Sequence, residues 1–238
     1  MRRRRFFSQA SGALTLGAAA LGLPGLSSLA LAKARSRRKP AVPYAETRER
    51  NRAMFEGMFE LDVPLLDFDW IVVHHTAAEY ATLEGIDRYH RNHFGDPLGA
   101  EYHFVINNGK KRPVEKPIGL VEQARWRYQE WAGHLFHPER APGSCAICLI
   151  GNFETRALPE EMLDACVELT RVLMTRFNIP VERVTTHRGV DRRLTQCPGK
   201  HFPREEFLKR LSAPEAASAS AEAEAVDAVE AAEAIEAP

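Results

Sequence analysis

The stretch Asp69–Thr76, with the sequence DWIVVHHT, decides how the rest of this chain is interpreted. Its residues 71–73 are an unbroken run of β-branched apolar side chains, which indicates a strand buried on both faces. A strand of this kind belongs in the middle of an α/β sheet. His74 and His75 follow directly at its carboxyl end, where functional side chains of such sheets gather. The stretch therefore predicts a central strand that delivers imidazoles to a site.

A second stretch, Val184–Phe202 (VTTHRGVDRRLTQCPGKHF), supplies groups that suit those imidazoles. A short run of Val and Thr leads to His187, and Cys197 follows just before a Pro-Gly turn. If the strands that end at His74 and at residue 186 are neighbours, two imidazoles and one thiolate come together. Zinc favours this ligand set, and three protein ligands leave its fourth position open for water, as in catalytic sites. We therefore expect one zinc ion per chain.

Other roles for the same side chains stay open at this point. The chain has nine His, so a His at a strand end also arises by chance, as a core imidazole with satisfied hydrogen bonds. His75 is an alternative ligand to His74. The cysteines allow disulfides in an exported protein. Cys145 and Cys148 form a single C-x-x-C motif within an apolar run, and we interpret them, with Cys166, as small core residues.

The chain around these stretches alternates helical and extended patterns. Residues 107–110 (NNGK) predict an Asn-Gly hairpin turn with a return strand near Val114. Residues 117–129 look irregular, and we interpret Arg125–Arg127 within them as a solvated loop, with a groove wall as the alternative. Helices are expected over residues 45–59, 82–94, 159–177 and 203–211, and strands over 69–76, 101–106, 145–151 and 184–186. The order predicts an α/β fold, a single domain with a mixed central sheet of about five strands and helices on both faces.

The two ends of the chain differ from its middle. Residues 1–32 begin with RRRRFF, continue with an Ala/Leu/Gly-rich run and end in a small-x-small site, which predicts a signal peptide of the twin-arginine type. A retained membrane anchor is the alternative. Residues 33–62 are interpreted as a linker and a leading helix, 63–212 as the folded domain and 213–238 as a disordered Ala/Glu tail. We expect a periplasmic or otherwise exported protein with no stable membrane span after cleavage.

The charge of the chain is balanced, with 32 basic and 32 acidic residues and a formal net charge of zero. This balance provides no argument for a nucleic-acid partner, and we expect none.

Five motifs in order give the sequence a family resemblance. They are IVVHHTA, EYHFVINNG, WAGHLF, ICLIGNFE and THRGVDRRLTQCPGKHF, and they lie within residues 68–202, which the resemblance covers. Together they resemble the zinc N-acetylmuramoyl-L-alanine amidases, which include the peptidoglycan recognition proteins and the phage lysozyme-type amidases. That resemblance implies a mixed sheet with flanking helices, in agreement with the pattern above.

Particular residues take roles from this resemblance. It implies that His74, His187 and Cys197 bind zinc and that Tyr102 and Thr195 act on the reacting carbonyl. It also implies a peptidoglycan-binding groove, for which the expected substrate-binding residues are His134, Trp131 and Asn107. Plainer roles stay open: Tyr102 as a packed strand aromatic, His134 as a loop residue, Thr195 as a cap of the turn before Cys197. The His-to-Cys spacing is two residues longer than in typical recognition proteins, and the extra residues around 191–194 are expected to reshape one groove wall.

The function implied by the resemblance is hydrolysis of the amide bond between the lactyl group of N-acetylmuramic acid and L-alanine of the stem peptide, in cell-wall remodelling or recycling. The expected partners are peptidoglycan or muropeptides, and the expected state is a monomer. A recognition module that binds muropeptide without cutting it is the alternative, and a structural zinc domain is a third. The complete set of three ligands favours the enzyme.

Overall fold

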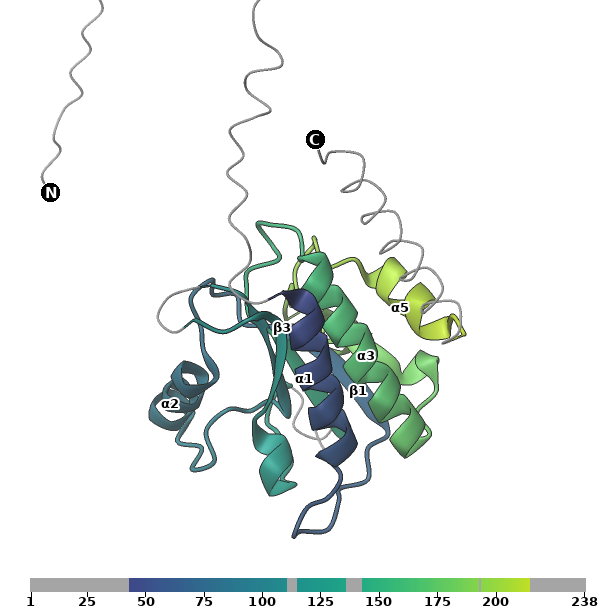
Figure 1. The fold of residues 1–238 in the computed structure, drawn as a ribbon. Helices are drawn as coiled ribbons and strands as arrows, with labels where there is room; N and C mark the ends of the chain where they lie inside the picture. Colours follow the sequence, from purple (N-terminus) through teal and green to yellow (C-terminus); the bar gives the residue numbers. More distant parts are fainter. Residues whose placement is uncertain (1–42, 111–114, 136–142, 193, 215–238) are drawn as a thin grey trace, which may run out of the picture. The chain divides into compact units, whose positions relative to one another are not determined.

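A computed structural model describes residues 43–110, 115–135, 143–192 and 194–214 (Figure 1). Four predictions fall on residues outside these ranges. They are the signal peptide, most of the linker, the return strand near Val114 and nearly all of the Ala/Glu tail. Among the described residues, no helix combines the length and apolar character needed to cross a membrane.

The described residues form helices and strands in an alternating order. The elements are α1 (Tyr44–Gly57), β1 (Trp70–His75), α2 (Leu83–Phe94), β2 (Phe104–Asn108), β3 (Ile118–Gln123), the 3-10 helix η2 (Arg125–Tyr128), β4 (Ser144–Leu149), α3 (Glu160–Phe177), the 3-10 helix η4 (Val181–Arg183), β5 (Val184–Thr186), α4 (His187–Val190) and α5 (Arg204–Ser212). The helices expected over 45–59, 82–94, 159–177 and 203–211 are therefore confirmed as α1, α2, α3 and α5, within a few residues at each end.

Five strands make one mixed sheet in the order β3-β2-β4-β1-β5. β1 is parallel to both of its neighbours, β4 and β5, while β2 is parallel to β4 and antiparallel to β3. The central position expected for residues 69–76 is confirmed, because β1 has a hydrogen-bonded strand on each side. The parallel pairing of β1 and β5 also brings their carboxyl ends to the same edge of the sheet.

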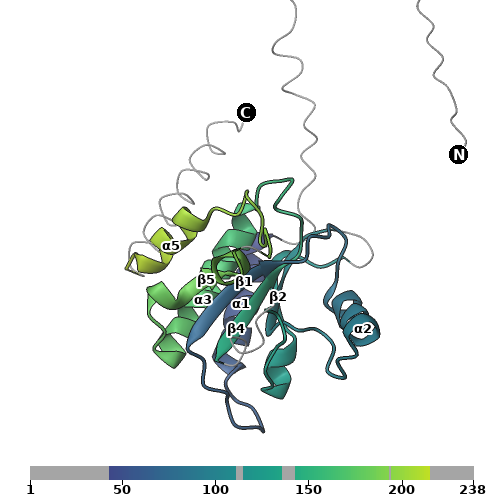
Figure 2. The same cartoon turned by 180° about the vertical axis from the view of Figure 1, so that it is seen from behind.

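Helices cover the two faces of this sheet unequally. α1 and α3 lie together on one face, and α5 packs against α3 (Figure 1). α2 lies on the opposite side, where Leu83 and Ile86 pack with Val105 and Cys148 of the strands. Figure 2 shows β1 and β4 from that side, which α1 and α3 leave uncovered. The prediction of helices on both faces is confirmed.

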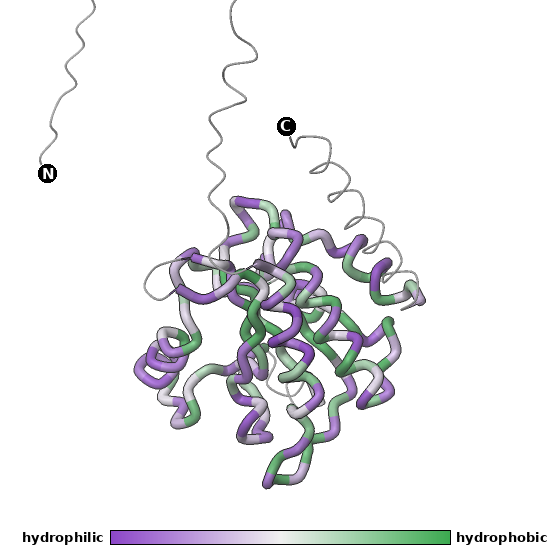
Figure 3. The backbone as a smooth tube through the Cα atoms, viewed as in Figure 1, coloured by the Kyte–Doolittle hydropathy of each residue, from purple (hydrophilic) through white to green (hydrophobic). Residues whose placement is uncertain are grey.

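The main core lies between the sheet and the pair α1 and α3. Strand side chains point into it at alternate positions, as the period of a β-strand requires. The fully buried strand members are Ile71, Val73, Phe104, Ile106, Cys145, Ile147 and Leu149. Figure 3 shows the apolar segments concentrated in the strands and the hydrophilic stretches outside them.

The hairpin expected after β2 is confirmed, because β3 follows β2 and pairs with it antiparallel, but the predicted position of its turn at residues 107–110 is too early. The strand runs on through Asn107 and Asn108, and Asn108 pairs with Ile118 at the start of β3, inside the stretch expected to be irregular. The reason lies in contacts from outside the turn. The Asn107 side chain donates hydrogen bonds to the Leu120 carbonyl at 3.0 Å and to the Glu122 carboxylate at 2.6 Å, so a polar residue is stabilised within the ladder.

The interpretation of Arg125–Arg127 as a solvated loop is also wrong for its first two residues. Trp126 is fully buried, and its indole N–H donates to the Met58 carbonyl at 2.8 Å. Arg125 is buried as well, and its guanidinium forms an ion pair with Asp96 at 2.5 Å. An arginine was expected to remain in water, but a buried arginine is stable when its charge is paired and its N–H groups have acceptors.

All four cysteines are free and buried, so the disulfide alternative is excluded. Cys145 packs into the main core, while Cys148 packs on the opposite face with α2. Two thiols on opposite faces of one strand cannot act as a redox or metal pair. The interpretation of Cys145, Cys148 and Cys166 as small core residues is confirmed.

Candidate metal centre

Three side chains from separate parts of the chain meet at the carboxyl edge of the sheet. His74 ends β1, His187 follows β5, and Cys197 lies in the loop before α5. One potential ligand atom from each lies within 4.8 Å of the others. The parallel pairing of Val73 with Thr186 places the two histidines side by side, one position further along each strand.

His74 is held almost completely inside the protein. Its exposed fraction is 1%, and its Nδ1 lies 3.8 Å from Cys197 Sγ. Burial lowers the pKa of His74 well below its ordinary value, and the neighbouring His134 and His187 lower it further. The imidazole is therefore neutral at physiological pH, which is the form that binds a metal ion.

His187 is set in place by the short helix that it begins. Thr186 caps this helix, because its hydroxyl accepts a hydrogen bond from the Gly189 N–H at 3.2 Å. His187 Nε2 lies 3.2 Å from a carboxylate oxygen of the buried Asp191. Burial lowers the pKa of His187, and Asp191 opposes that shift. Metal-binding histidines commonly have such a carboxylate on the other ring nitrogen.

Asp191 is a site residue that the sequence analysis missed. It belongs to the longer His-to-Cys connection, which we expected to reshape a groove wall. The sequence spacing could have indicated this position. Two residues four apart on a helical turn lie on the same face of the helix, so Asp191 can reach the His187 ring.

Cys197 is fixed by backbone contacts on both sides. The backbone N–H of His75 donates to its Sγ at 3.3 Å, and the Thr195 hydroxyl accepts a hydrogen bond from the Cys197 N–H at 3.0 Å. Burial raises the pKa of the Cys197 thiol to about 12, against the opposing effect of the His75 N–H. A bound cation would reverse this and hold the sulfur as thiolate. His75 therefore contributes its backbone to the thiol, while its ring Nδ1 accepts from the Phe153 N–H.

The turn after Cys197 requires glycine. Gly199 has a φ of +105°, and a Cβ there would lie 2.3 Å from the Phe153 carbonyl carbon. The His201 N–H also donates to the Phe153 carbonyl at 2.9 Å. The Pro-Gly motif and the Gly-Asn-Phe motif thus form one packed unit, and this unit determines where the thiol lies.

Tyr102 lies beside the three candidate ligands, just before β2 rather than within it. Its ring centroid is 5.4 Å from that of His74, and its side chain hydrogen-bonds to Cys148. Burial raises the pKa of Tyr102 well above its ordinary value. The phenol therefore keeps its proton over the whole physiological range and is available as a donor.

A cavity of about 740 Å³ opens beside this centre. His187, Tyr102 and His134 line it, together with side chains from α2 and from the loop after β1. Three exposed aromatic rings line the same cavity: Tyr80, Tyr89 and Phe94, which are 67%, 51% and 63% exposed. A hollow with aromatic walls and a few polar groups at one end is the usual form of a ligand site.

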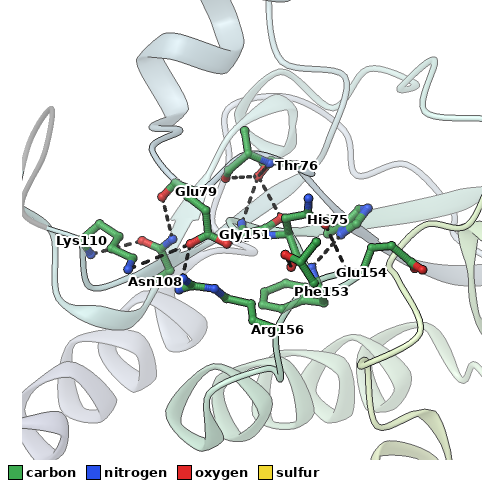
Figure 4. Close-up of polar contacts among 12 residues, drawn as sticks. His75, Thr76, Glu79, Asn108, Lys110, Gly151, Phe153, Glu154 and Arg156 are labelled. Atoms are coloured by element: carbon green, nitrogen blue, oxygen red, sulfur yellow. Dashed lines mark hydrogen bonds and ion pairs between the residues drawn. The ribbon is translucent and has the colours of Figure 1, made fainter. Parts of the chain in front are cut away.

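The loop after β1, which forms one wall of this cavity, is firmly anchored. Figure 4 shows Glu79 among Asn108, Lys110 and Arg156. The Glu79 carboxylate pairs with Arg156 at 2.9 Å, and the Asn108 side chain donates to the Glu79 carbonyl at 3.0 Å. Thr76 also accepts a hydrogen bond from the Gly151 N–H at 3.0 Å. This wall is therefore connected to both neighbouring loops.

The expected substrate-binding residues lie in different surroundings. His134 lines the cavity but is 6% exposed, and its Nδ1 lies 2.9 Å from His74 Nε2. Asn107 is buried against β3, and the Trp131 ring packs edge-on against Phe68, so neither is among the residues that line the cavity. Thr195, expected to act on the carbonyl, is also outside that lining, and its hydroxyl is the cap described above.

The fold and the site together define a class: an α/β protein with a mixed five-stranded sheet and a His-His-Cys cluster beside a cavity. The sequence profile of the N-acetylmuramoyl-L-alanine amidase family matches residues 64–200, which is more than half of the chain. The chain belongs to this family.

Two solved amidase structures agree with this assignment. The chain is 27% identical to N-acetylmuramoyl-L-alanine amidase LysC from Clostridium intestinale, with a TM-score of 0.52 over 65% of this chain and 93% of that one. The endolysin amidase LysCS from the same organism gives the same identity and TM-score, over 65% of this chain and 91% of that one. Bumblebee PGRP-SA is 21% identical, with a TM-score of 0.48 over 60% and 87% of the two chains. A search of curated proteins gave no match.

Proposed function

We propose that this protein is a zinc-dependent N-acetylmuramoyl-L-alanine amidase, which hydrolyses the amide bond between the lactyl group of N-acetylmuramic acid and L-alanine of the stem peptide. One observation carries the proposal: the ligand atoms of His74, His187 and Cys197 lie within 4.8 Å of one another, beside a cavity that Tyr102 also lines. Membership of the amidase family and the likeness to two named amidases support it.

The donor set fits zinc. Two imidazoles and one thiolate are a common set for Zn²⁺, and three ligands are the number typical of catalytic sites. Both histidines are held neutral by burial, so neither has to lose a proton before binding. When bound, zinc supplies Lewis-acid polarisation of the carbonyl and a hydroxide at neutral pH.

Tyr102 would serve as the hydrogen-bond donor to the oxygen of the scissile carbonyl. Its raised pKa keeps the phenol protonated, and its ring lies next to His74. A donor that is fixed before the reaction stabilises the negative charge that develops on this oxygen, by about 3 kcal/mol for one such group.

The cavity would hold the part of the substrate on either side of the scissile bond. Tyr80, Tyr89 and Phe94 offer exposed ring faces, and Arg88 and Glu101 add charge of both signs. Peptidoglycan or soluble muropeptides are the proposed substrates, and export to the periplasm or beyond is the proposed location.

The test is release of stem peptide from purified peptidoglycan and from a soluble muropeptide, with zinc present and after chelation. We expect release that the chelator abolishes and added zinc restores. Cys197→Ala should abolish both release and zinc binding. Cys145→Ala is the matched control, since Cys145 is a buried thiol on the opposite face of the sheet, and this variant should keep its zinc and its activity.

Two other outcomes would lead to different conclusions. A protein that binds one zinc ion and holds muropeptide without releasing peptide would be a recognition module. A folded protein with no zinc affinity would overturn the metal centre itself.

A further inference from the structure

His134 forms the middle of a buried chain of hydrogen-bonding groups behind the metal centre. His74 Nε2 lies 2.9 Å from His134 Nδ1, and His134 Nε2 lies 2.9 Å from the Ser144 hydroxyl oxygen. The planes of the His74 and His134 rings are nearly perpendicular, at 88°. His74, His134 and Ser144 are all buried, with exposed fractions of 1%, 6% and 1%.

The direction of these hydrogen bonds follows from Ser144, the last group in the hydrogen-bonded series. The Ser144 backbone also hydrogen-bonds to His134 and raises the pKa of this imidazole, while burial lowers it more strongly. Since Nδ1 of His134 faces His74 and Nε2 faces Ser144, the Ser144 carbonyl is a partner of Nε2, and a carbonyl has no proton to donate. With the proton of His134 on Nε2, its Nδ1 is an acceptor.

An acceptor at His134 Nδ1 fixes the state of the next ring. His74 must then carry its proton on Nε2 and donate it to His134. The remaining nitrogen of His74, Nδ1, is left with its lone pair, and this is the atom 3.8 Å from Cys197 Sγ. The opposite placement of protons would put N–H on Nδ1 and prevent His74 from binding a metal ion.

We propose that His134 is a positioning residue: with the Ser144 carbonyl, it sets the tautomer and the orientation of His74, so that Nδ1 is ready to bind zinc. This inference rests on the proposed zinc centre. It gives His134 a role different from the substrate contact expected from the sequence. Partners of this kind on the second nitrogen of a ligating histidine change metal affinity by about 10- to 100-fold when they are removed.

Zinc affinity, measured by competition with a chromogenic chelator, tests this inference independently of catalysis. His134→Leu keeps most of the side-chain volume and removes the acceptor, and we expect its zinc affinity to fall about 10- to 100-fold. His134→Asn places an amide oxygen near the position of Nδ1 and should restore most of the affinity. Ser144→Ala is the matched control: it removes the hydroxyl but keeps the carbonyl, so the loss should stay below about fivefold.

Nitrogen NMR of the histidine rings in the unmodified, zinc-loaded protein is a second measurement that does not depend on any variant folding. We expect His74 to carry its proton on Nε2 and His134 on Nε2. Protonation of His74 on Nδ1 would overturn the inference.

The inference and the proposed function can fail separately. If the wild-type protein binds zinc and cleaves muropeptide, but His134→Leu binds zinc equally tightly, His134 is not a positioning residue and the amidase proposal stands. If His134→Leu keeps its zinc affinity and only its KM rises, the substrate-binding role expected from the sequence is correct instead. If the wild-type protein binds no zinc, the proposed function has failed first.

Discussion

The two faces of the sheet use the same strands for different purposes. Toward α1 and α3, the central strands β1, β2 and β4 bury a row of apolar side chains, such as Ile71, Phe104 and Ile147. Toward α2, they present a smaller apolar cluster and then His74, Tyr102 and the cavity. Val73 and His74 are consecutive residues of β1, yet they belong to different faces because side chains alternate along a strand. One face therefore provides stability and the other provides the site.

The difference between the faces explains why the site can be rigid. Each ligand is attached to a strand end or a loop that the packed face holds in position. A catalytic group needs support of this kind to remain within a fraction of an ångström of its working position. Substitutions on the two faces should therefore separate stability from chemistry.

The largest effect is expected at the metal ligands. His74→Ala should remove the zinc ion and reduce turnover by about a thousandfold or more, since a metal ion contributes several kcal/mol to amide hydrolysis. The free energy of unfolding without zinc should change little by comparison. Zinc content and stem-peptide release measure this, with His75→Ala as the control. A His75→Ala variant that loses its zinc would make His75 the ligand instead.

On the packed face, Ile147→Ala should lower the free energy of unfolding by about 2 to 5 kcal/mol, because Ile147 is fully buried and the substitution leaves a cavity. Below the unfolding temperature, turnover and zinc affinity should be close to those of the wild type. Urea unfolding and chelator competition are the measurements. Loss of zinc affinity in a variant that is still folded would contradict the separation of the two faces.

Tyr102→Phe should slow turnover about a hundredfold, which corresponds to about 3 kcal/mol in the activation barrier. Zinc affinity should stay the same, because the hydroxyl is lost but the ring remains beside His74. Steady-state kinetics on a soluble muropeptide separate kcat from KM. Wild-type turnover in this variant would exclude Tyr102 from the chemistry.

The buried His103 should make the stability of the protein depend on pH. Burial lowers its pKa from 6.5 to about 3, and Arg125 adds to the shift. Since the folded protein holds the neutral ring, the unfolded chain binds the proton first as the pH falls below 6.5. As the pH falls from 6.5 to 3, this difference in proton binding therefore lowers the free energy of unfolding by up to about 1.4 kcal/mol for each pH unit.

His103→Gln should make the unfolding free energy less dependent on pH in that window. Urea unfolding at pH 7 and pH 4.5 compares the two proteins, and equal pH dependence would show that His103 is not the group that titrates.

The smallest effect is expected at the far end of α3. Asn178 has a φ of 52° at the end of this helix, and its N–H donates to the Met174 carbonyl. Alanine tolerates this conformation less well than asparagine, so Asn178→Ala should cost about 1 kcal/mol of stability. Glycine has no such strain, and Asn178→Gly is the control. Thermal unfolding measures both, and the activity of either variant should be unchanged.

Local sequence patterns predicted much of the packed face. The run at residues 71–73 identified the central strand, and the spacing of apolar residues with Asn178 and Pro180 at the end identified α3. These features depend on hydrophobic period and backbone preference, which act between residues close in the chain. The pattern around Asn107 predicted the hairpin but placed its turn too early for the same reason: the contacts that keep this residue in β2 come from β3.

The sequence by itself determined the family, the central strand and the three candidate ligands, because these are carried by residue types in local patterns. Only the tertiary structure decided what stands behind the ligands. His134 reaches His74 from sixty residues away, and the position of the Cys197 thiol depends on Gly199 packing against Phe153. Hydrogen bonds between distant segments depend on the positions of several backbones at once, and no local pattern records those positions.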